Sequence, residues 1–126
     1  PIPEFVVTDT EIHFNPILFD FNKYEITKQS KKILDKLVYI MNQNVAMEIY
    51  IKAHTDSKGT AKYNLNLSEK RVQSTVNYIL SKGISTTRIS GKGFGEAEPR
   101  INCGDKCTDE EHFQNRRSEF LIVKDK

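Results

Sequence analysis

The sequence predicts an α/β fold, a β-α-β-α-β-β sandwich in which two helices pack on one face of a mixed parallel and antiparallel sheet. Two segments, about 27–42 and 65–82, carry apolar residues at helical spacing, and residues 47–53 between them alternate apolar with polar residues. Short apolar runs towards both ends of the chain read as further strands. Because right-handed crossovers between parallel strands keep their helices on one side, the two helices are expected to share a face.

The first part of the chain leads into the first helix. Residues 5–7 and 11–14 read as short extended segments, and the Asn-Pro dipeptide that follows is a turn, because proline does not continue a strand. Thr27 is a plausible N-cap, from which the helix is expected to run to about Asn42. Its apolar residues at i, i+3 and i+4 spacing are Ile33, Leu34, Leu37, Val38 and Met41.

The alternating segment 47–53 is the clearest strand of the sequence, because every second residue is apolar and can face a core. The helix after it is expected to be the longest element and to end near Ser81. Lys82 suits a helix C-terminus, and Gly83 suits the left-handed cap that often follows one.

The last third of the chain is expected to hold a short strand within 84–89 and a buried final strand at 119–123. The stretch GKGFGEAEP (91–99) is predicted to be a loop with turn glycines. Its glycines resemble a dinucleotide-binding loop only superficially, because no helix is expected after them.

Length and charge limit the function classes. With 126 residues, the whole chain 1–126 has the size of one domain. Its 19 Lys and Arg against 17 Asp and Glu give a net charge of +2, which indicates no nucleic-acid partner. No run approaches the roughly 18 apolar residues of a membrane span. The start at Pro1 without Met suggests excision from a longer precursor, although Met removal or a cloning scar would look the same.

Cys103 and Cys107 lie four residues apart in a loop-like stretch of Gly, Asp and Lys. They could close a small disulfide, worth ~2 kcal/mol on the chain-entropy model. A metal clip formed by the two cysteines and His112 is the alternative, but it lacks an evident fourth ligand and standard zinc spacing. No metal and no cofactor are therefore expected.

Catalytic signatures are weak. His54, Asp56 and His112 could form a catalytic or metal cluster, but no nucleophile elbow, His-Glu-x-x-His helix or closely spaced carboxylate pair accompanies them. His54 is interpreted as a strand-end histidine that makes a structural hydrogen bond, because a lone imidazole rarely proves to be a ligand. The chain is therefore not expected to be an enzyme.

Asp56 and Arg71 are more informative, because the loop after the clearest strand carries the acid and the next helix carries the base. If both face one cleft, a zwitterionic ligand with an ammonium and a carboxylate on one carbon would satisfy both. Asp56 would accept from the ammonium, and Arg71 would hold the carboxylate as a planar fork. Spacing alone leaves open an ordinary surface ion pair, worth under ~1 kcal/mol.

Four stretches together resemble the OmpA-like domain family, in the family's order. They are ILFDFNKYEI (17–26), HTDSKGTAKYNLNLSEKRVQSTVNYILSKGI (54–84), RISGKGFGEAEP (88–99) and NRRSEF (115–120). The resemblance spans about residues 12–123 and implies noncovalent, non-catalytic binding of peptidoglycan. The family's ligand is the peptide stem, usually through meso-diaminopimelate, whose side-chain end carries the ammonium and carboxylate pair argued for above.

The resemblance also assigns binding roles to particular positions. The family's acid falls on Asp56 and its base on Arg71. The other implied positions are Thr55, Asn64 and Leu67 on the pocket wall, Phe19, Asp20 and Asn22 on a covering loop, and Arg116, the first arginine of the NRR motif.

The chain departs from the commonest family pattern in INCGDKCTDEEHFQ (101–114), where most members have a shorter stretch without cysteines. This segment resembles the variant found in Bacteroidota, whose Cys103 and Cys107 pair is expected to be oxidised in the periplasm. The resemblance implies a periplasmic domain of an outer-membrane-associated protein, attached through a segment absent from this chain, with possible protein partners in the envelope. A wall-acting enzyme and a protein-interaction domain that has lost the ligand are the alternatives.

Overall fold

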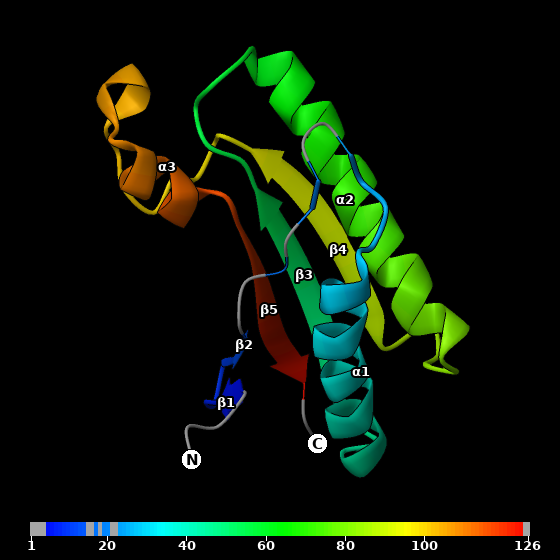
Figure 1. The fold of residues 1–126 in the computed structure, drawn as a ribbon. Helices are drawn as coiled ribbons and strands as arrows, with labels where there is room; N and C mark the ends of the chain where they lie inside the picture. Colours follow the sequence, from blue (N-terminus) through cyan, green and yellow to red (C-terminus); the bar gives the residue numbers. More distant parts are fainter. Residues whose placement is uncertain (1–4, 15–16, 18, 21–22, 125–126) are drawn as a thin grey trace.

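The computed structural model describes residues 5–14, 17, 19–20 and 23–124. Figure 1 shows the helices and strands with their labels. In chain order they are β1 (Phe5–Val7), β2 (Glu11–Phe14), α1 (Lys28–Gln43), β3 (Glu48–His54), α2 (Ala61–Ser81), β4 (Ile89–Gly95), the 3-10 turn η1 (Gly104–Lys106), α3 (Asp109–Asn115) and β5 (Arg117–Lys124).

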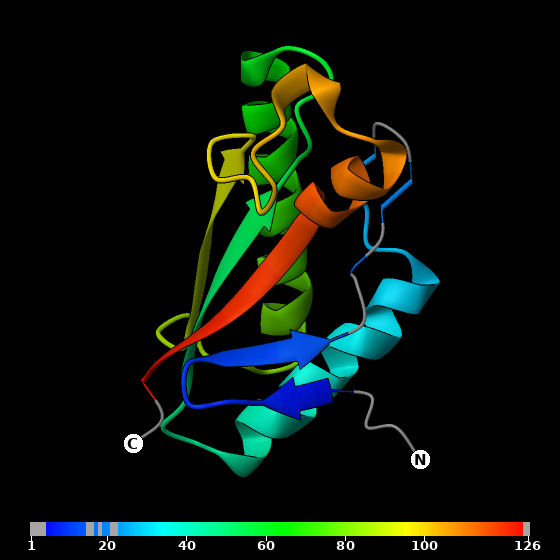
Figure 2. The same cartoon turned by 90° about the vertical axis from the view of Figure 1, so that its left-hand side faces the viewer.

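The strands of the described part of the chain form one mixed sheet, in the order β1-β2-β5-β3-β4. β5 pairs antiparallel with both β2 and β3, whereas β3 and β4 are parallel. β2 and β3 therefore run in the same direction, and the connections through α1 and α2 step across the sheet the same way. Right-handed crossovers of this kind place both helices on one face. Figure 2 looks onto the sheet with α1 and α2 behind it, as the sequence predicts.

The two long helices begin at threonine caps. The Thr27 side chain accepts a hydrogen bond from the Ser30 amide at 3.2 Å, and the Thr60 side chain accepts one from the Tyr63 amide at 3.1 Å. Gly83 has a φ of 96° after the end of α2, the left-handed conformation predicted for it. α2 begins earlier than the apolar pattern indicates, because polar residues make up most of its first turn.

A buried apolar layer between the sheet and the helices holds these elements together. Its residues include Ile12, Ile49, Ile51 and Phe120 of the sheet, Leu34, Leu37 and Met41 of α1, and Val72 and Ile79 of α2. Each such side chain stabilises the fold by roughly 1.5–3 kcal/mol when fully buried. Within the ranges that the structure describes, no helix has the length and apolar character needed to span a membrane.

β4 differs from the sequence prediction. The expected strand within 84–89 begins only at its last residue, and the expected loop over 91–99 is strand as far as Gly95. β4 pairs in parallel with β3 along this length. The glycines that suggested turns are therefore mostly strand residues.

Close packing against α2 explains these strand glycines. A Cβ atom on Gly93 would lie 2.5 Å from the Ser68 hydroxyl oxygen, and a Cβ atom on Gly91 would lie 2.7 Å from a methyl group of Val72. Glycine in a strand often marks such an approach. Gly91 and Gly93 let α2 lie directly on β4, and Gly95, with a φ of 55°, turns the chain out of the strand.

The segment between β4 and β5 contains a short helix, α3, that was not predicted. A capping box starts it: the Thr108 side chain accepts from the Glu111 amide, and the Glu111 side chain accepts from the Thr108 amide. β5 then begins at Arg117, two residues before the predicted final strand. In both views α3 lies at the end of the sheet where α2 begins.

Candidate functional site

A pocket of about 470 Å³ opens at the end of β3, among the first turns of α2, the segment around Phe19, and α3. Side chains from four separate parts of the sequence meet there. The lining residues are Ile17, Phe19, Ala53, His54, Thr55, Asp56, Lys58, Tyr63, Asn64, Leu67, Ser68, Arg71, Phe113, Arg116, Arg117 and Ser118.

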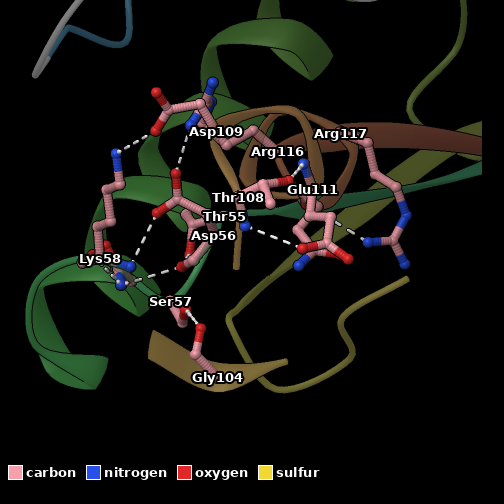
Figure 3. A network of polar contacts seen from close by, with 12 residues as sticks. Thr55, Asp56, Ser57, Lys58, Gly104, Thr108, Asp109, Glu111, Arg116 and Arg117 are labelled. Carbon is pink, nitrogen blue, oxygen red and sulfur yellow. Dashed lines mark hydrogen bonds and ion pairs between the residues drawn. The ribbon is translucent and has the colours of Figure 1, made fainter. Parts of the chain in front are cut away.

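Asp56 lines this pocket and is only 7% exposed. Its Oδ1 accepts a hydrogen bond from the Lys58 amide at 2.9 Å, and its Oδ2 accepts one from Arg116 Nη1 at 2.5 Å. Asn64 Nδ2 donates to the Lys58 carbonyl at 2.8 Å and so ties this loop to α2. Figure 3 shows the contacts of Asp56 within the surrounding polar network. The loop thus fixes the carboxylate by contacts within the protein.

Arg71 reaches the pocket from α2 and is held by the segment that precedes α1. Its Nε donates to the Lys23 carbonyl at 3.0 Å and its Nη2 to the Asp20 carbonyl at 3.5 Å, while its guanidinium lies 4.7 Å from the centre of the Phe19 ring. Burial lowers the pKa of Arg71, and the positive charge of Arg116 lowers it further. Arg71 nevertheless remains a cation, because a guanidinium is not deprotonated in proteins, and backbone carbonyls set its position.

The ion pair in the pocket differs from the one that the spacing suggested. Asp56 and Arg71 line the same pocket, but the partner of Asp56 is Arg116. Arg116 comes from the turn between α3 and β5, sixty residues further along the chain. Asp56 is thus bonded to Arg116, and Arg71 lines the same pocket with its hydrogen bonds made to backbone carbonyls.

α2 presents its pocket residues on one face. Asn64, Leu67, Ser68 and Arg71 are spaced i, i+3, i+4 and i+7, which places them on one side of a helix. Ser68 is buried, and its hydroxyl accepts a hydrogen bond from the Gly95 amide at 2.9 Å. This bond joins the end of β4 to the face of α2 that carries Arg71.

The disulfide loop completes the rim. Cys103 and Cys107 are bonded to each other, with their Cα atoms 5.1 Å apart, which excludes the alternative of a thiolate metal clip. Ser57 donates from its hydroxyl to the Gly104 carbonyl inside this loop at 2.5 Å. Among the residues that the structure describes, no three His, Cys, Asp or Glu side chains are arranged to hold a metal ion.

Asn115 fastens α3 to the segment before the disulfide loop. Its side-chain amide donates to the Ile101 carbonyl at 3.0 Å, and its side-chain oxygen accepts from the Ile101 amide at 2.8 Å. It is buried to 2% exposure. These two bonds join the two ends of the segment 101–115, and they fix the position of α3 and of Arg116, which follows it.

The structure places the residues implied by the family resemblance as follows. Seven of them line the pocket: Phe19, Thr55, Asp56, Asn64, Leu67, Arg71 and Arg116. Asp20 contributes its backbone carbonyl to Arg71 rather than a side-chain contact to the pocket, and Asn22 lies outside the described residues. Sequence reasoning missed Tyr63 and Phe113, two half-exposed aromatic side chains at the pocket. The capping pattern Thr-Asp-Glu-Glu at 108–111 was the available signal for the helix that carries Phe113.

The sequence pattern of the OmpA family matches residues 18–116. The chain belongs to the OmpA family. The matched range includes the Asp56 loop, the pocket face of α2 and Arg116. The OmpA family consists of non-catalytic domains, so membership decides between the binding domain and the enzyme considered from the sequence in favour of the binding domain.

Individual relatives agree with this assignment. The chain is 28% identical to the peptidoglycan-associated lipoprotein of Haemophilus influenzae, over 90% of this chain and 72% of the relative. It is 38% identical to outer membrane protein A of Klebsiella aerogenes, over 75% of this chain but only 27% of that longer protein. Among solved structures, a MotB-like protein from Desulfovibrio vulgaris is 27% identical, with a TM-score of 0.75 over 84% of this chain and 67% of that one.

Proposed function

We propose that this chain, as a single domain, binds peptidoglycan noncovalently through the meso-diaminopimelate of the peptide stem. One observation carries the proposal. A carboxylate acceptor, Asp56, and a forked guanidinium donor, Arg71, line one pocket in a chain that belongs to the OmpA family. Its relatives include proteins named peptidoglycan-associated lipoprotein.

The chemistry of the pocket matches that of the ligand. The side-chain end of diaminopimelate carries an ammonium and a carboxylate on one carbon. Asp56 supplies acceptor oxygens for the ammonium, and the N–H groups of Arg71 that form no hydrogen bond to the described residues supply parallel donors for the carboxylate. Phe19 and Leu67 add apolar surface for the methylene groups of the same side chain. The volume of about 470 Å³ lies within the range typical of small-molecule sites.

The resemblance and the disulfide support a place in the cell envelope. Outer membrane protein A is among the relatives, and disulfides persist in oxidising compartments such as the periplasm. In this proposal the domain lies in the periplasm and tethers an outer-membrane protein or lipoprotein to the cell wall through a segment outside this chain. The resemblance of the cysteine-containing segment to the variant found in Bacteroidota stays a prediction.

Co-sedimentation with insoluble peptidoglycan that contains diaminopimelate tests the proposal. Asp56→Asn and Arg71→Gln each remove one charge from the pocket and should each lower the bound fraction, with a loss of affinity of about tenfold or more. Asp9→Asn and Lys32→Gln remove the same charges from exposed positions outside the pocket and should bind like the wild type.

Thermal unfolding of all four variants serves as the control for folding. Asp56→Asn and Arg71→Gln proteins that stay folded and sediment with the wall as well as the wild type would refute the proposal. A wild-type protein that does not sediment at all would instead favour a protein partner on this fold.

A further inference from the structure

Two arginines, each beside a phenylalanine ring, line the pocket with Asp56, the one acid among its described lining residues. The guanidinium of Arg71 lies 4.7 Å from the centre of the Phe19 ring, and that of Arg116 lies 5.8 Å from the centre of the Phe113 ring. Both arginines line the pocket with Asp56. The first pair belongs to α2 and the segment before α1, and the second belongs to α3 and the turn after it.

The charges of the pocket are therefore unequal. Arg71, Arg116 and Lys58 bring three positive charges to its lining, against the one negative charge of Asp56. Lys58 has an outside partner, Asp109, at 3.7 Å, but both side chains are largely exposed and this pair is worth little. Arg117, also on the lining, is paired with Glu119 at 3.6 Å.

The two arginines also affect one another. After burial, the positive charge of Arg116 is among the causes that lower the pKa of Arg71, and Asp56 acts in the opposite direction. A single carboxylate thus offsets the repulsion between the two cations only in part. A ligand with a zwitterionic end group has no net charge, so it leaves the excess of positive charge in the pocket unchanged.

Arg116 has hydrogen-bonding capacity left over. One N–H of its five contacts Asp56, and the others form no hydrogen bond to the described residues. Its side chain is 42% exposed, so a ligand can reach it from the pocket mouth. When an ammonium binds Asp56, the remaining N–H groups of Arg116 can donate to a second anionic group.

From these contacts we infer that Arg116 binds a second carboxylate of the ligand, so that the site takes a peptide with two carboxylates for each ammonium. The inference rests on the proposed function, because it assigns Asp56 and Arg71 to the side-chain end of diaminopimelate. Arg116, supported by the Phe113 ring, then selects among peptide stems. Phe113 acts here as a positioning residue for Arg116.

Two groups of the stem can supply the second carboxylate. One is the α-carboxylate of diaminopimelate itself, which is free when this residue ends the peptide. The other is the α-carboxylate of the preceding glutamate, which is free because glutamate is joined through its side chain. Both would meet Arg116 through the same fork-like pairing.

Calorimetric titration with three tripeptides distinguishes these sources. The first is alanyl-γ-glutamyl-diaminopimelate, the second carries an amide in place of the diaminopimelate α-carboxylate, and the third carries an amide in place of the glutamate α-carboxylate. Each is titrated into the wild type, Arg116→Gln and Arg116→Lys. We expect one of the two amidations to weaken binding to the wild type about tenfold. The same amidation should weaken binding to Arg116→Gln by less than about threefold, because the group that it removes has already lost its partner.

In Arg116→Lys, the effect of that amidation on binding should lie between its effects in the wild type and in Arg116→Gln, because lysine keeps the positive charge but lacks the planar fork of donors. If both amidations weaken binding equally in the wild type and in Arg116→Gln, or weaken neither, Arg116 only orients Asp56 and the inference is overturned. That result would leave the proposed function standing, because the unmodified tripeptide would still bind. No binding of any tripeptide would instead count against the proposed function.

Discussion

At the scale of single residues, Asp56 is prepared for a ligand before one arrives. A carboxylate offers about four acceptor positions. Asp56 uses its Oδ1 for the Lys58 amide of its own loop and its Oδ2 for Arg116, so its orientation is set by the protein. Fixing a group in its binding geometry removes part of the entropy cost of association. The remaining acceptor positions can receive an ammonium.

His54, two residues earlier, contributes to stability. Its side chain is 1% exposed, and its Nε2 lies 2.7 Å from Glu119 Oε1. Because a carboxylate only accepts, Nε2 carries the proton, and Nδ1 is buried without a partner among the described residues. Burial, followed by the positive charge of Arg117, lowers the pKa of His54, although Glu119 acts against them. The structural hydrogen bond expected for His54 is therefore made to β5.

This arrangement predicts a loss of stability in mild acid. Below a pH of about 6.5, the unperturbed pKa of histidine, the unfolded chain takes up a proton at His54 that the folded chain does not. Burial alone would raise the pKa of Glu119, but the hydrogen bond from His54 and the charge of Arg117 lower it overall. Its stabilising contribution is therefore also lost as the pH falls, at lower values than for His54.

Urea unfolding across the range from about pH 7.5 to pH 5 measures this effect. The free energy of unfolding should fall with pH in the wild type and fall less steeply in His54→Gln, which cannot titrate at that position. An identical slope in both proteins would show that another group is responsible.

Part of the pocket could be predicted from the sequence. Their positions after a strand and on the next helix suggested a shared cleft for Asp56 and Arg71 but left an ordinary surface ion pair open, and only the family resemblance added Asn64 and Leu67. The pairing of Asp56 with Arg116 was not predictable, because it depends on where the turn between α3 and β5 places Arg116.

At the scale of elements, the contact between α2 and β4 shows why turn signals mislead. Three glycines within five residues normally indicate a loop. Here Gly91 and Gly93 replace side chains that would collide with α2, so the reason for glycine lies in tertiary packing. Nothing local in the sequence distinguishes these two causes.

Gly93→Ala tests this explanation. The added methyl group would collide with backbone atoms of Ser68 and Glu69, which cannot move without displacing α2. We expect the free energy of unfolding to fall by about 2 kcal/mol or more, as for overpacked cores. Denaturant unfolding measures it, and Ser90→Ala on the exposed side of the same strand is the matched control. Equal stability of the two variants would contradict the close packing of α2 on β4.

α3 was not predicted from the sequence, for a different reason. It has only seven residues and no apolar periodicity, so the only local indication was the Thr-Asp-Glu-Glu cap. The disulfide before it and the Asn115 contacts to Ile101 hold it in place. Elements this short depend on tertiary contacts, which a single sequence does not display.

At the scale of the whole molecule, the topology explains why four distant segments meet. β3 and β4 are parallel, so their C-terminal ends lie at one edge of the sheet, where α2 begins. β5 is antiparallel to β3 and lies beside it, so its first residues, and the turn with Arg116, reach the same edge. The segment around Phe19 arrives there on its way to α1. Ligands of open α/β sheets commonly bind at such an edge.

The overall architecture was predictable where the site details were not. Periodicity identified α1, β3 and α2, and the handedness of crossovers placed both helices on one face of a mixed sheet. These rules act on long segments and tolerate errors at their ends. The shape of the pocket rim depends instead on the 101–114 segment, whose conformation is set by a disulfide and a few side-chain contacts.

The central claim is that Asp56 and Arg71 together read a zwitterionic side chain. The most direct test is calorimetric titration with a stem peptide that contains diaminopimelate, beside the same peptide with lysine, which has the ammonium but lacks the adjacent carboxylate. We predict saturable binding of the diaminopimelate peptide to the wild type, and binding at least about tenfold weaker for the lysine peptide and for Asp56→Asn. Equal affinity for the two peptides, or undiminished binding by Asp56→Asn, would contradict the account.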